Sequence, residues 1–397
     1  MEKNLPKATH QHTRTHNRRL IFRTIFDHDR ISRADVARAT GLTRTTVSQV
    51  VDNLIRRKMV KEVGTGSSTG GKSPILLSVP SNARQLIGVD LGSPEFRGAI
   101  VNLRGEIQYS LTMPLDGQQG TAALERAFNL IDALKAHATS PLLGIGVGVP
   151  GVIDPTKGSS VHWAVNLSWL DLPIRALLKK RYRLPIYVAN DAHAAVLAES
   201  FFGNCKNLNL IVVKVESGVS AGIFANGELW KGDGFGAGEI GHVTVVENGP
   251  LCNCGHRGCL EAVIRKDALV QRVRLAAQND AGRLRERVRN WNALSFDDIV
   301  WAWHANDPAT TTVVCETAQF LGSALANLVG AWNINHIVLA GPLKGFGERF
   351  LQEIRKTMSS HALAHLVEDT QIEYSSLGAE IVILGASALL LDEVFGM

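Results

Sequence analysis

The feature that most constrains the fold of this chain is an arrangement that occurs twice, in which an apolar strand is followed by a hairpin, a helix and a second apolar strand. In the first copy, the strand over residues 85–91 ends in Asp90-x-Gly92, and a hairpin, a helix and a strand ending in Val149-Pro150-Gly151 follow. In the second copy, the strand over residues 210–215 runs into Glu216-Ser217-Gly218, and a later strand ends in Ala340-Gly341-Pro342. Two copies of one plan predict two α/β lobes, and ligands bind in the cleft outside the strand ends of such sheets.

The predicted lobes cover residues 81–195 and 196–381, and we expect the last helix, over residues 382–397, to pack on the first lobe. A chain of 397 residues with 45% apolar residues can form two or three domains with sizeable cores. Its first 19 residues are polar and basic, and it contains no run of 18 apolar residues. We therefore expect a cytoplasmic protein that does not enter a membrane.

The first 80 residues differ in charge from the rest. They contain 15 lysine and arginine residues against 6 aspartate and glutamate residues, a net charge of +9, whereas the remaining 317 residues have a net charge of −4. Basic side chains displace counterions from a phosphate backbone, so this distribution is typical of a nucleic-acid-binding head on a mildly acidic body. A solvated basic arm would have the same composition, and charge alone does not separate the two.

Residues 18–58 have the pattern of a helix-turn-helix. A first helix follows a polar, flexible arm over residues 1–17. Ser32, with Asp35 three residues later, predicts the start of a second helix. Gly41 allows a tight turn after that helix, and Thr43 caps a third one. We expect the second helix to turn three side chains inward, namely Val36, Ala37 and Ala39.

The third helix begins with polar groups that suit a DNA groove. Glutamine can bond adenine with both ends of its amide, and short hydroxyl side chains reach phosphates or base edges. Two strands, over residues 59–63 and 75–79, predict a hairpin wing with a basic tip. The expected DNA contacts are Arg44, Thr45, Thr46, Ser48, Gln49 and, at the tip of the wing, Lys72.

A generic helical interaction domain would contain similar helices. The charge, the two caps, the turn and the wing together favour a winged helix-turn-helix DNA-binding domain over residues 1–80, and we expect it to fold on a core of its own.

Three of the five cysteines lie within eight positions, at Cys252, Cys254 and Cys259. Three soft thiolates at this spacing suit Zn²⁺, and a histidine would complete a tetrahedral site that leaves no position for water. His242, ten residues upstream, and His256, inside the cluster, are the two candidates. The pattern predicts one structural zinc ion per chain rather than three free thiols.

Several motifs together resemble those of the ROK family, named for repressors, open reading frames and kinases. They cover nearly the whole chain, and the last two are the most specific: Val149-Pro150-Gly151 with Asp154, Val165-Asn166-Leu167-Ser168-Trp169, Asn190-Asp191, Gly238-Glu239-Ile240-Gly241-His242, and the segment from Cys252 to Glu261. The resemblance implies an actin-like, sugar-kinase-like body of two lobes, a sugar in the cleft, and His242 as the fourth zinc ligand.

The same resemblance implies a set of sugar contacts. Carboxylates and amides form paired hydrogen bonds with vicinal hydroxyls, and a buried polar set rejects ligands that lack them. Asp191 matches the catalytic base of the family's kinases. His193 stands where the family commonly has asparagine, which bears on sugar specificity. The implied contacts are Asn166, Asn190, Asp191, Glu239, His242 and Glu261.

The two phosphate loops depart from the kinase pattern. The first reads Asp90-Leu91-Gly92-Ser93-Pro94, in which Pro94 removes a backbone N–H and fixes φ. The second reads Glu216-Ser217-Gly218, which predicts a carboxylate facing a triphosphate. Phosphoryl transfer depends on positioning and charge neutralisation, so both changes together indicate a protein that is not an enzyme.

The sequence therefore predicts a sugar-responsive repressor that acts as a dimer or a dimer of dimers on a palindromic operator and is released by its sugar. An ATP-dependent sugar kinase with a regulatory head is the main alternative. A repressor controlled by a partner protein is a third hypothesis. Glucose, N-acetylglucosamine, xylose and short glucosides all remain open as the effector.

Overall fold

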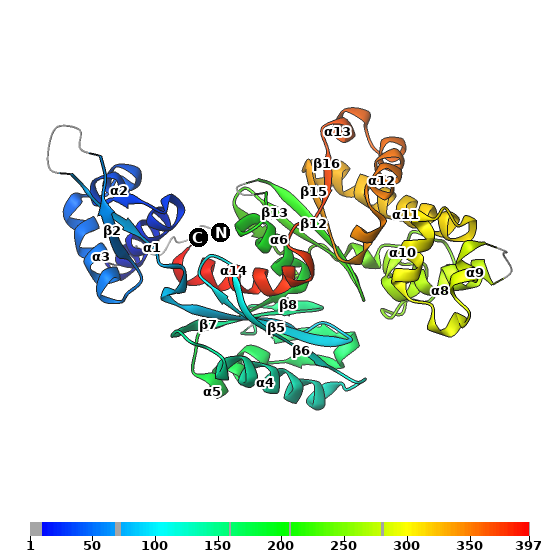
Figure 1. Cartoon of the computed structure of the whole chain (residues 1–397), viewed down its shortest axis with the longest axis horizontal. Helices are drawn as coiled ribbons and strands as arrows, with labels where there is room; N and C mark the ends of the chain where they lie inside the picture. Colours follow the sequence, from blue (N-terminus) through cyan, green and yellow to red (C-terminus); the bar gives the residue numbers. More distant parts are fainter. Residues whose placement is uncertain (1–9, 68–72, 159, 206–207, 279–281, 397) are drawn as a thin grey trace, which may run out of the picture.

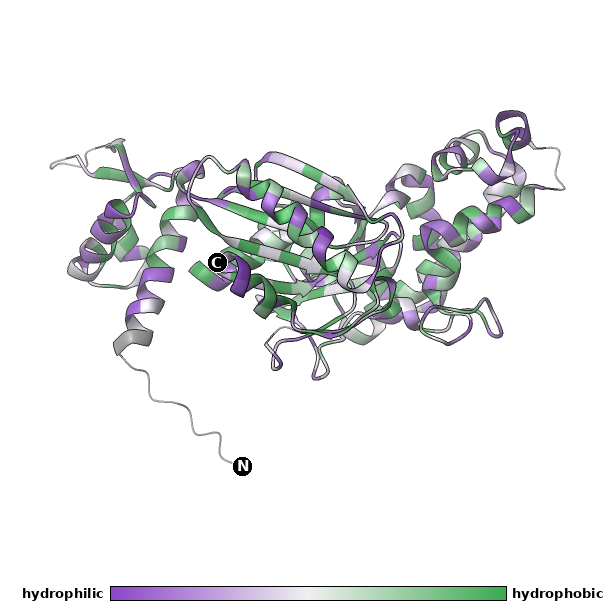
Figure 2. Ribbon diagram, turned by 90° about the horizontal axis from the view of Figure 1, so that it is seen from below, coloured by the Kyte–Doolittle hydropathy of each residue, from purple (hydrophilic) through white to green (hydrophobic). Residues whose placement is uncertain are grey.

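The structure, a computed structural model, describes residues 10–67, 73–158, 160–205, 208–278 and 282–396. A small head and a body of two α/β lobes lie side by side (Figure 1). The last helix, α14 (Ile381–Phe395), lies in the body and ends beside the head. Hydrophobic residues follow the strands of the body, whereas the head helices alternate between polar and apolar residues (Figure 2). This arrangement confirms the predicted winged head on a two-lobed body.

The head consists of three helices and a small antiparallel sheet. The helices are α1 (His10–His28), α2 (Arg33–Thr40) and α3 (Arg44–Arg56). The sheet has the order β1 (Ile31–Ser32), β3 (Ile75–Ser78) and β2 (Lys61–Thr65). As predicted, Ser32 Oγ accepts the Asp35 N–H, Thr43 Oγ1 accepts the Thr46 N–H, and Gly41 ends α2 with a φ of 68°.

Two expectations about the head are wrong. Helix α1 begins at His10, so residues 10–17 of the predicted arm are helical. Ala39 is exposed, because it falls on the solvent side of α2, whereas Val36 and Ala37 are buried. Lys72, at the predicted tip of the wing, lies outside the described residues.

The first lobe contains a five-stranded sheet in the order β11-β7-β4-β5-β6. Strands β4 (Gln85–Asp90), β7 (Leu142–Val149) and β11 (Ile186–Asn190) are parallel, and β5 (Glu95–Asn102) and β6 (Ile107–Pro114) complete an antiparallel edge. Helices α4 (Gly120–Ala136) and α5 (Ile174–Tyr182) share one buried cluster with this sheet. A small sheet of β8 (Val152–Asp154), β9 (Ser160–Ala164) and β10 (Trp169–Leu172) follows β7.

The second lobe repeats this plan with a sheet in the order β14-β13-β12-β15-β16. β12 (Leu210–Val215), β15 (His336–Ala340) and β16 (Gln371–Tyr374) are parallel, while β13 (Val219–Ala225) and β14 (Glu228–Trp230) form the predicted hairpin at Asn226-Gly227. Helix α6 (Asp191–Phe201) packs on β12 and β13. The helices that follow β14 in this lobe are α7 (Leu260–Ile264), α8 (Lys266–Ala277), α9 (Arg283–Arg287), α10 (Phe296–His304), α11 (Pro308–Trp332), α12 (Glu348–His361) and α13 (Ala364–Glu368).

Among the residues that the structure describes, one helix, α11, is long and apolar enough to cross a membrane. It packs against α12 and α8, and Val314, Leu321 and Leu325 lie fully buried in the core of the second lobe. This is the position of a core helix in a globular lobe.

Helix α14 packs on β4, β7 and β11 of the first lobe and along α6. Its backbone comes so close to its neighbours that only glycine fits at two of the contacts. A Cβ on Gly146 would collide with the carbonyl oxygen of Ala386, and one on Gly385 would collide with the carbonyl oxygen of Ala194. The helix therefore holds a fixed position against both the sheet and α6.

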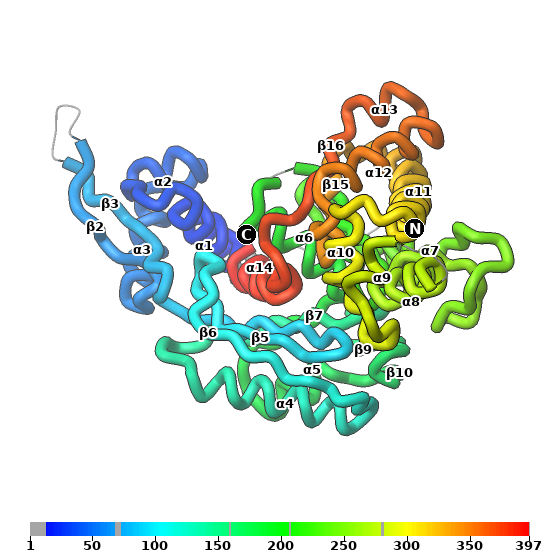
Figure 3. Tube along the Cα trace, turned by 45° about the vertical axis from the view of Figure 1, so that its right-hand side comes forward, coloured from blue at the N-terminus to red at the C-terminus, as the bar shows by residue number. Residues whose placement is uncertain are grey.

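The head does not have a core of its own, contrary to expectation. Its buried residues form one cluster with Leu86, Leu103, Leu390, Leu391 and Phe395 of the body. The rings of Phe22 and Phe395 stack with centroids 4.1 Å apart, so the C-terminus lies beside α1 (Figure 3). The sequence did not reveal this contact because its partners are more than 370 positions apart.

Arg104, in the turn after β5, fixes the head from a second side. Its Nη1 donates to the Phe26 carbonyl oxygen at 2.8 Å, and its guanidinium lies over the Phe26 ring. The head is thus held by an aromatic stack from α14 and by a cation from the first lobe.

Replacing Phe395 with alanine should loosen the head while the body stays folded. Truncating a buried phenylalanine costs about 3–5 kcal/mol, and this one supports α1. Hydrogen exchange should show faster exchange in α1 and unchanged protection in β4 and β7. Leu363→Ala, an exposed site in the second lobe, is the control. Unchanged protection of α1 in Phe395→Ala would show that the stack does not anchor the head.

Candidate ligand cavity, metal cluster and DNA-reading helix

One cavity of about 290 Å³ between the lobes is lined by all six residues expected to contact a sugar. Asn190 ends β11 and Asp191 begins α6, while Asn166 lies in the turn Val165–Leu167. The second lobe contributes Glu239 and His242 from the turn around Ile240–His242, and Glu261 from α7. The cavity is therefore built from both lobes, at the strand ends where the sequence places it.

Asn190 is already engaged within the protein. Its Oδ1 accepts the N–H groups of Ala192 at 2.8 Å and His193 at 3.1 Å, and its Nδ2 donates to the Gly151 carbonyl oxygen at 3.0 Å. Its amide thus caps α6 and joins that helix to the end of β7. These contacts give Asn190 a structural role in positioning Asp191 next to it.

Asp191 is held from two directions. Its Oδ1 accepts the Ala192 N–H at 2.9 Å, and its Oδ2 accepts from Lys214 Nζ at 3.1 Å. Lys214 lies near the end of β12, so the second lobe fixes a carboxylate of the first. The sequence reasoning missed Lys214, although a lysine inside the apolar strand Leu210–Val215 was a visible signal, because buried lysines need a partner.

The other carboxylates of the cavity are also buried or hydrogen-bonded. Burial, together with the charge of Asp191, raises the pKa of Glu239 to about 7. Glu261 Oε2 accepts the Val219 N–H at 3.0 Å. Asn166 Oδ1 lies 3.4 Å from Asn253 Nδ2, and both residues line the cavity. The site presents mainly hydrogen-bond acceptors, which suit a ligand rich in hydroxyl donors.

His193, the departure from the family pattern, does not line this cavity. It is buried, and its Nε2 lies 3.1 Å from the carbonyl oxygen of Ala237. Burial lowers the pKa of His193. Its substitution therefore changes the packing behind the cavity and not the cavity wall.

The phosphate-loop carboxylates are paired inside the protein. Arg97 Nη2 on β5 lies 3.0 Å from Asp90 Oδ2 and 3.2 Å from Glu216 Oε1. Burial raises the pKa of Asp90 to about 6, even though Lys214 and Arg97 oppose that shift. Burial acts in the same direction on Glu216, but Lys214 and Arg97 outweigh it and lower its pKa. Glu216 therefore faces two cations of the protein, a pairing that the sequence did not predict.

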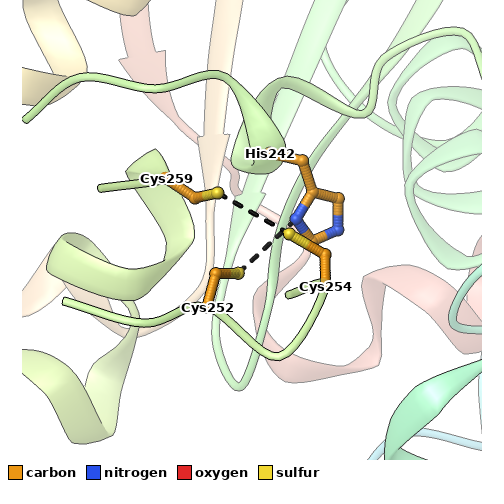
Figure 4. Close-up of side chains that lie close together, drawn as sticks. All are labelled: His242, Cys252, Cys254 and Cys259. Carbon is orange, nitrogen blue, oxygen red and sulfur yellow. Dashed lines mark hydrogen bonds between the residues drawn. The ribbon is translucent and has the colours of Figure 1, made fainter. Parts of the chain in front are cut away.

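Four predicted metal ligands converge beside the cavity: His242, Cys252, Cys254 and Cys259, whose ligand atoms all lie within 4.8 Å of one another (Figure 4). The Cys254 and Cys259 sulfurs are 3.7 Å apart, and Cys252 Sγ is 3.7 Å from His242 Nδ1. A tetrahedron with Zn–S bonds of about 2.3 Å has edges of about 3.8 Å, so this cluster has the size for a Zn²⁺ ion.

His256, the other candidate ligand, lies 3.5 Å from Cys254 through its Nδ1 but outside this four-residue group. His242 instead connects the two sites. Its Nδ1 faces Cys252, and its Nε2 lies 3.8 Å from Glu239 Oε2 in the cavity. One imidazole can thus bind a metal with one nitrogen and orient a cavity carboxylate with the other.

Helix α3 presents the predicted DNA-contacting residues at its N-terminal end. Arg44, Thr45 and Gln49 are exposed, and Ser48 is half-buried. Thr46 differs from the others, because its hydroxyl lies 2.9 Å from Thr43 Oγ1 within the helix cap. The surface that α3 offers to a DNA groove therefore consists mainly of Arg44, Thr45 and Gln49.

The sequence profile of the ROK family matches residues 86–393, and that of winged helix-turn-helix DNA-binding domains matches residues 14–61. The chain belongs to the ROK family. The second match places it, as predicted, with the members that carry a DNA-binding head.

Known relatives of this chain include both repressors and kinases. The chain is 31% identical to the xylose repressor of Caldicellulosiruptor bescii over 95% of its own length and 96% of that protein. It is 33% identical to the glucokinase of Halalkalibacterium halodurans, over 77% of this chain and 94% of the kinase. The fold matches that of a ROK family transcriptional regulator, a homologue of the E. coli Mlc protein, with a TM-score of 0.84 and 22% identity over 97% of both chains.

Proposed function

We propose that this chain is a transcriptional repressor whose affinity for operator DNA is controlled by a sugar bound between the lobes. The observation that carries the proposal is a cavity lined by carboxylates and amides of both lobes, in a chain whose head exposes a polar DNA-reading helix. The xylose repressor matches 95% of the chain, whereas the glucokinase matches 77% of it.

The wall of the cavity favours a neutral, hydroxyl-rich ligand. Asp191, Glu239 and Glu261 supply carboxylate oxygens, each of which can accept a hydrogen bond from a hydroxyl group. A ligand without those hydroxyls would leave the remaining acceptor positions of these carboxylates unpaired, at a cost of about 1–3 kcal/mol each. We infer an unphosphorylated sugar, because the carboxylates of Asp191 and Glu261 would repel a phosphate group.

A sugar kinase is the second candidate, and the glucokinase relative is the reason to consider it. A sugar kinase requires cationic or N–H groups that are free to bind phosphate, and a catalytic base that is free to accept a proton. Here Glu216 and Arg97 are paired with each other at the position where a kinase would bind phosphate. Lys214 binds Asp191, the carboxylate that matches the catalytic base of the kinases. These pairings support recognition of the sugar without phosphoryl transfer.

Helix α14 is the physical connection that we propose between the two sites. It packs along α6, which begins at the cavity with Asp191, and ends against α1 of the head. Closure of the cleft around a sugar would shift the lobes against this helix and so reorient the head. Two heads of a dimer would then no longer match two half-sites of the operator.

Sugar should release DNA, and Asp191→Asn should lose that response. The probe is a DNA duplex that the protein selects from a random-sequence pool, followed by fluorescence anisotropy with D-xylose, D-glucose and N-acetyl-D-glucosamine. We expect one sugar to weaken DNA binding about 5–150-fold, and Asp191→Asn to raise the sugar concentration needed by about tenfold. No ATP-dependent phosphorylation of that sugar is expected.

Asp171→Asn, an exposed carboxylate on β10 outside the cavity, is the matched control and should respond like the wild type. Robust phosphorylation of the bound sugar would favour the kinase. An unchanged response of Asp191→Asn would place the sensor elsewhere.

The purified chain should contain one zinc ion, held by His242, Cys252, Cys254 and Cys259. Cys254→Ser should lose the metal and weaken sugar binding, because the zinc would fix the segment that carries His242 and leads to Glu261. Elemental analysis and calorimetric titration measure the two effects. Cys315→Ser, a thiol on α11 outside the cluster, should keep both. A full zinc content in Cys254→Ser would remove that thiolate from the site.

Gln49→Ala should weaken binding to the selected duplex by about 1–3 kcal/mol and relax its base preference, because an exposed amide of α3 is lost from the groove. Gln352→Ala, an exposed glutamine on α12, is the control. Competition assays with single-base variants of the duplex measure the effect. Equal affinity and equal base preference in Gln49→Ala would exclude this residue as a base contact.

A further inference from the structure

Five charged side chains form a continuous chain of ion pairs across the cleft. The first lobe supplies Asp90 from β4, Arg97 from β5 and Asp191 from the start of α6. The second lobe supplies Lys214 from β12 and Glu216 directly after it. Lys214 Nζ lies 3.1 Å from Asp191 Oδ2 and 3.1 Å from Glu216 Oε2, and Arg97 Nη2 connects Glu216 to Asp90. We call these five residues the interlobe bridge.

The bridge crosses between the lobes at two places. Lys214 of the second lobe binds Asp191 of the first, and Arg97 of the first lobe binds Glu216 of the second. Lys214 takes part in both, because its single ammonium contacts both carboxylates. A movement of one lobe against the other must therefore change the surroundings of Lys214.

Lys214 cannot leave this position at low cost. Its side chain is 8% exposed and that of Asp191 is 11% exposed, so both charges depend on their partners rather than on water. Burial lowers the pKa of Lys214, but the two carboxylates outweigh burial and raise it, so the ammonium stays charged. Buried ion pairs are weak evidence for stability, but they are well suited to fixing one arrangement of their partners.

The bridge and the ligand cavity share residues. Asp191 and Lys214 line the cavity together with Glu239 and Glu261. Since Lys214 occupies Oδ2 of Asp191 and the Ala192 N–H occupies Oδ1, the plane of this carboxylate is set before a ligand arrives. A ligand hydroxyl that binds Asp191 therefore shares this carboxylate with Lys214.

We propose that Lys214 is a positioning residue of the ligand site, which orients the Asp191 carboxylate toward the ligand and joins it, through Glu216 and Arg97, to the contact between the lobes. The proposal rests on the proposed sugar-binding function. It assigns to Lys214 and Glu216 separate effects: Lys214 serves both affinity and signalling, whereas Glu216 serves signalling between the lobes.

Three variants test these roles. Lys214→Met keeps the length of the side chain and removes its charge, Lys214→Arg restores a charge, and Glu216→Gln removes the second partner but leaves the Asp191 pair intact. Lys214→Met should bind the sugar that releases DNA from the wild type at least tenfold more weakly, the usual effect of losing a hydrogen bond to a charged group. Lys214→Arg should recover part of that loss, which a variant with general packing damage would not.

Glu216→Gln should bind the sugar within about threefold of the wild type, but the sugar should release the selected DNA duplex less completely. Calorimetry with D-xylose, D-glucose or N-acetyl-D-glucosamine gives the affinity, and anisotropy gives the release. Thermal melting identifies a Lys214→Met protein that fails to fold. In that case the sugar affinity of Lys214→Arg, which should lie below that of the wild type, tests the positioning role, and Glu216→Gln, whose side chain is partly exposed, tests the signalling role.

Hydrogen exchange of the ligand-free protein tests the bridge without any sugar. Residues 190–196 and 214–220 should exchange faster in Glu216→Gln than in the wild type, and residues 348–358 on α12 should not change. A wild type that no sugar releases, with this exchange difference present, would contradict the proposed function and leave the bridge standing. Equal sugar affinity in folded Lys214→Met and the wild type, or full release together with unchanged exchange in Glu216→Gln, would overturn the inference.

Discussion

The close packing of α14 is the constraint on which the rest of the structure depends. Its backbone touches the sheet of the first lobe at Gly146, and α6 at Gly385, with no space for a side chain at either contact. Its far end stacks Phe395 on Phe22 of the head. Since protein interiors are close-packed, a helix held at both ends transmits a shift instead of absorbing it. Helix α6 begins at the ligand cavity and packs on α14, and α14 ends against the DNA-reading head. The cavity and the head are thus connected by two rigid helices.

Much of this molecule could be predicted from the sequence, because the signals were local. Caps at Ser32 and Thr43, the turn at Gly41 and the spacing of three cysteines each depend on residues a few positions apart. The shared core of head and body and the pairing of Arg97 with Glu216 could not be predicted. Those contacts join residues separated by more than 100 positions, and no local pattern specifies which distant charge or ring will meet another.

The electrostatics of the cleft bear on our proposal that this chain binds a sugar without phosphorylating it. A kinase needs cations that are free for phosphates, but here Arg97 and Lys214 are used by Asp90, Asp191 and Glu216 of the same chain. These ion pairs connect the two lobes across the cleft. The remaining acceptors, Glu239 and Glu261, face a cavity that a neutral sugar would fill.

The central claim is that sugar and operator DNA bind to different arrangements of one coupled structure. Coupling of this kind is reciprocal, so DNA must weaken sugar binding by the same factor by which sugar weakens DNA binding. The direct measurement is calorimetric titration of the sugar that releases DNA into the free protein and into the protein saturated with its selected duplex. We predict equal factors from both directions, within the range of about 5–150-fold. A sugar affinity that is identical in the presence and absence of DNA would contradict the account.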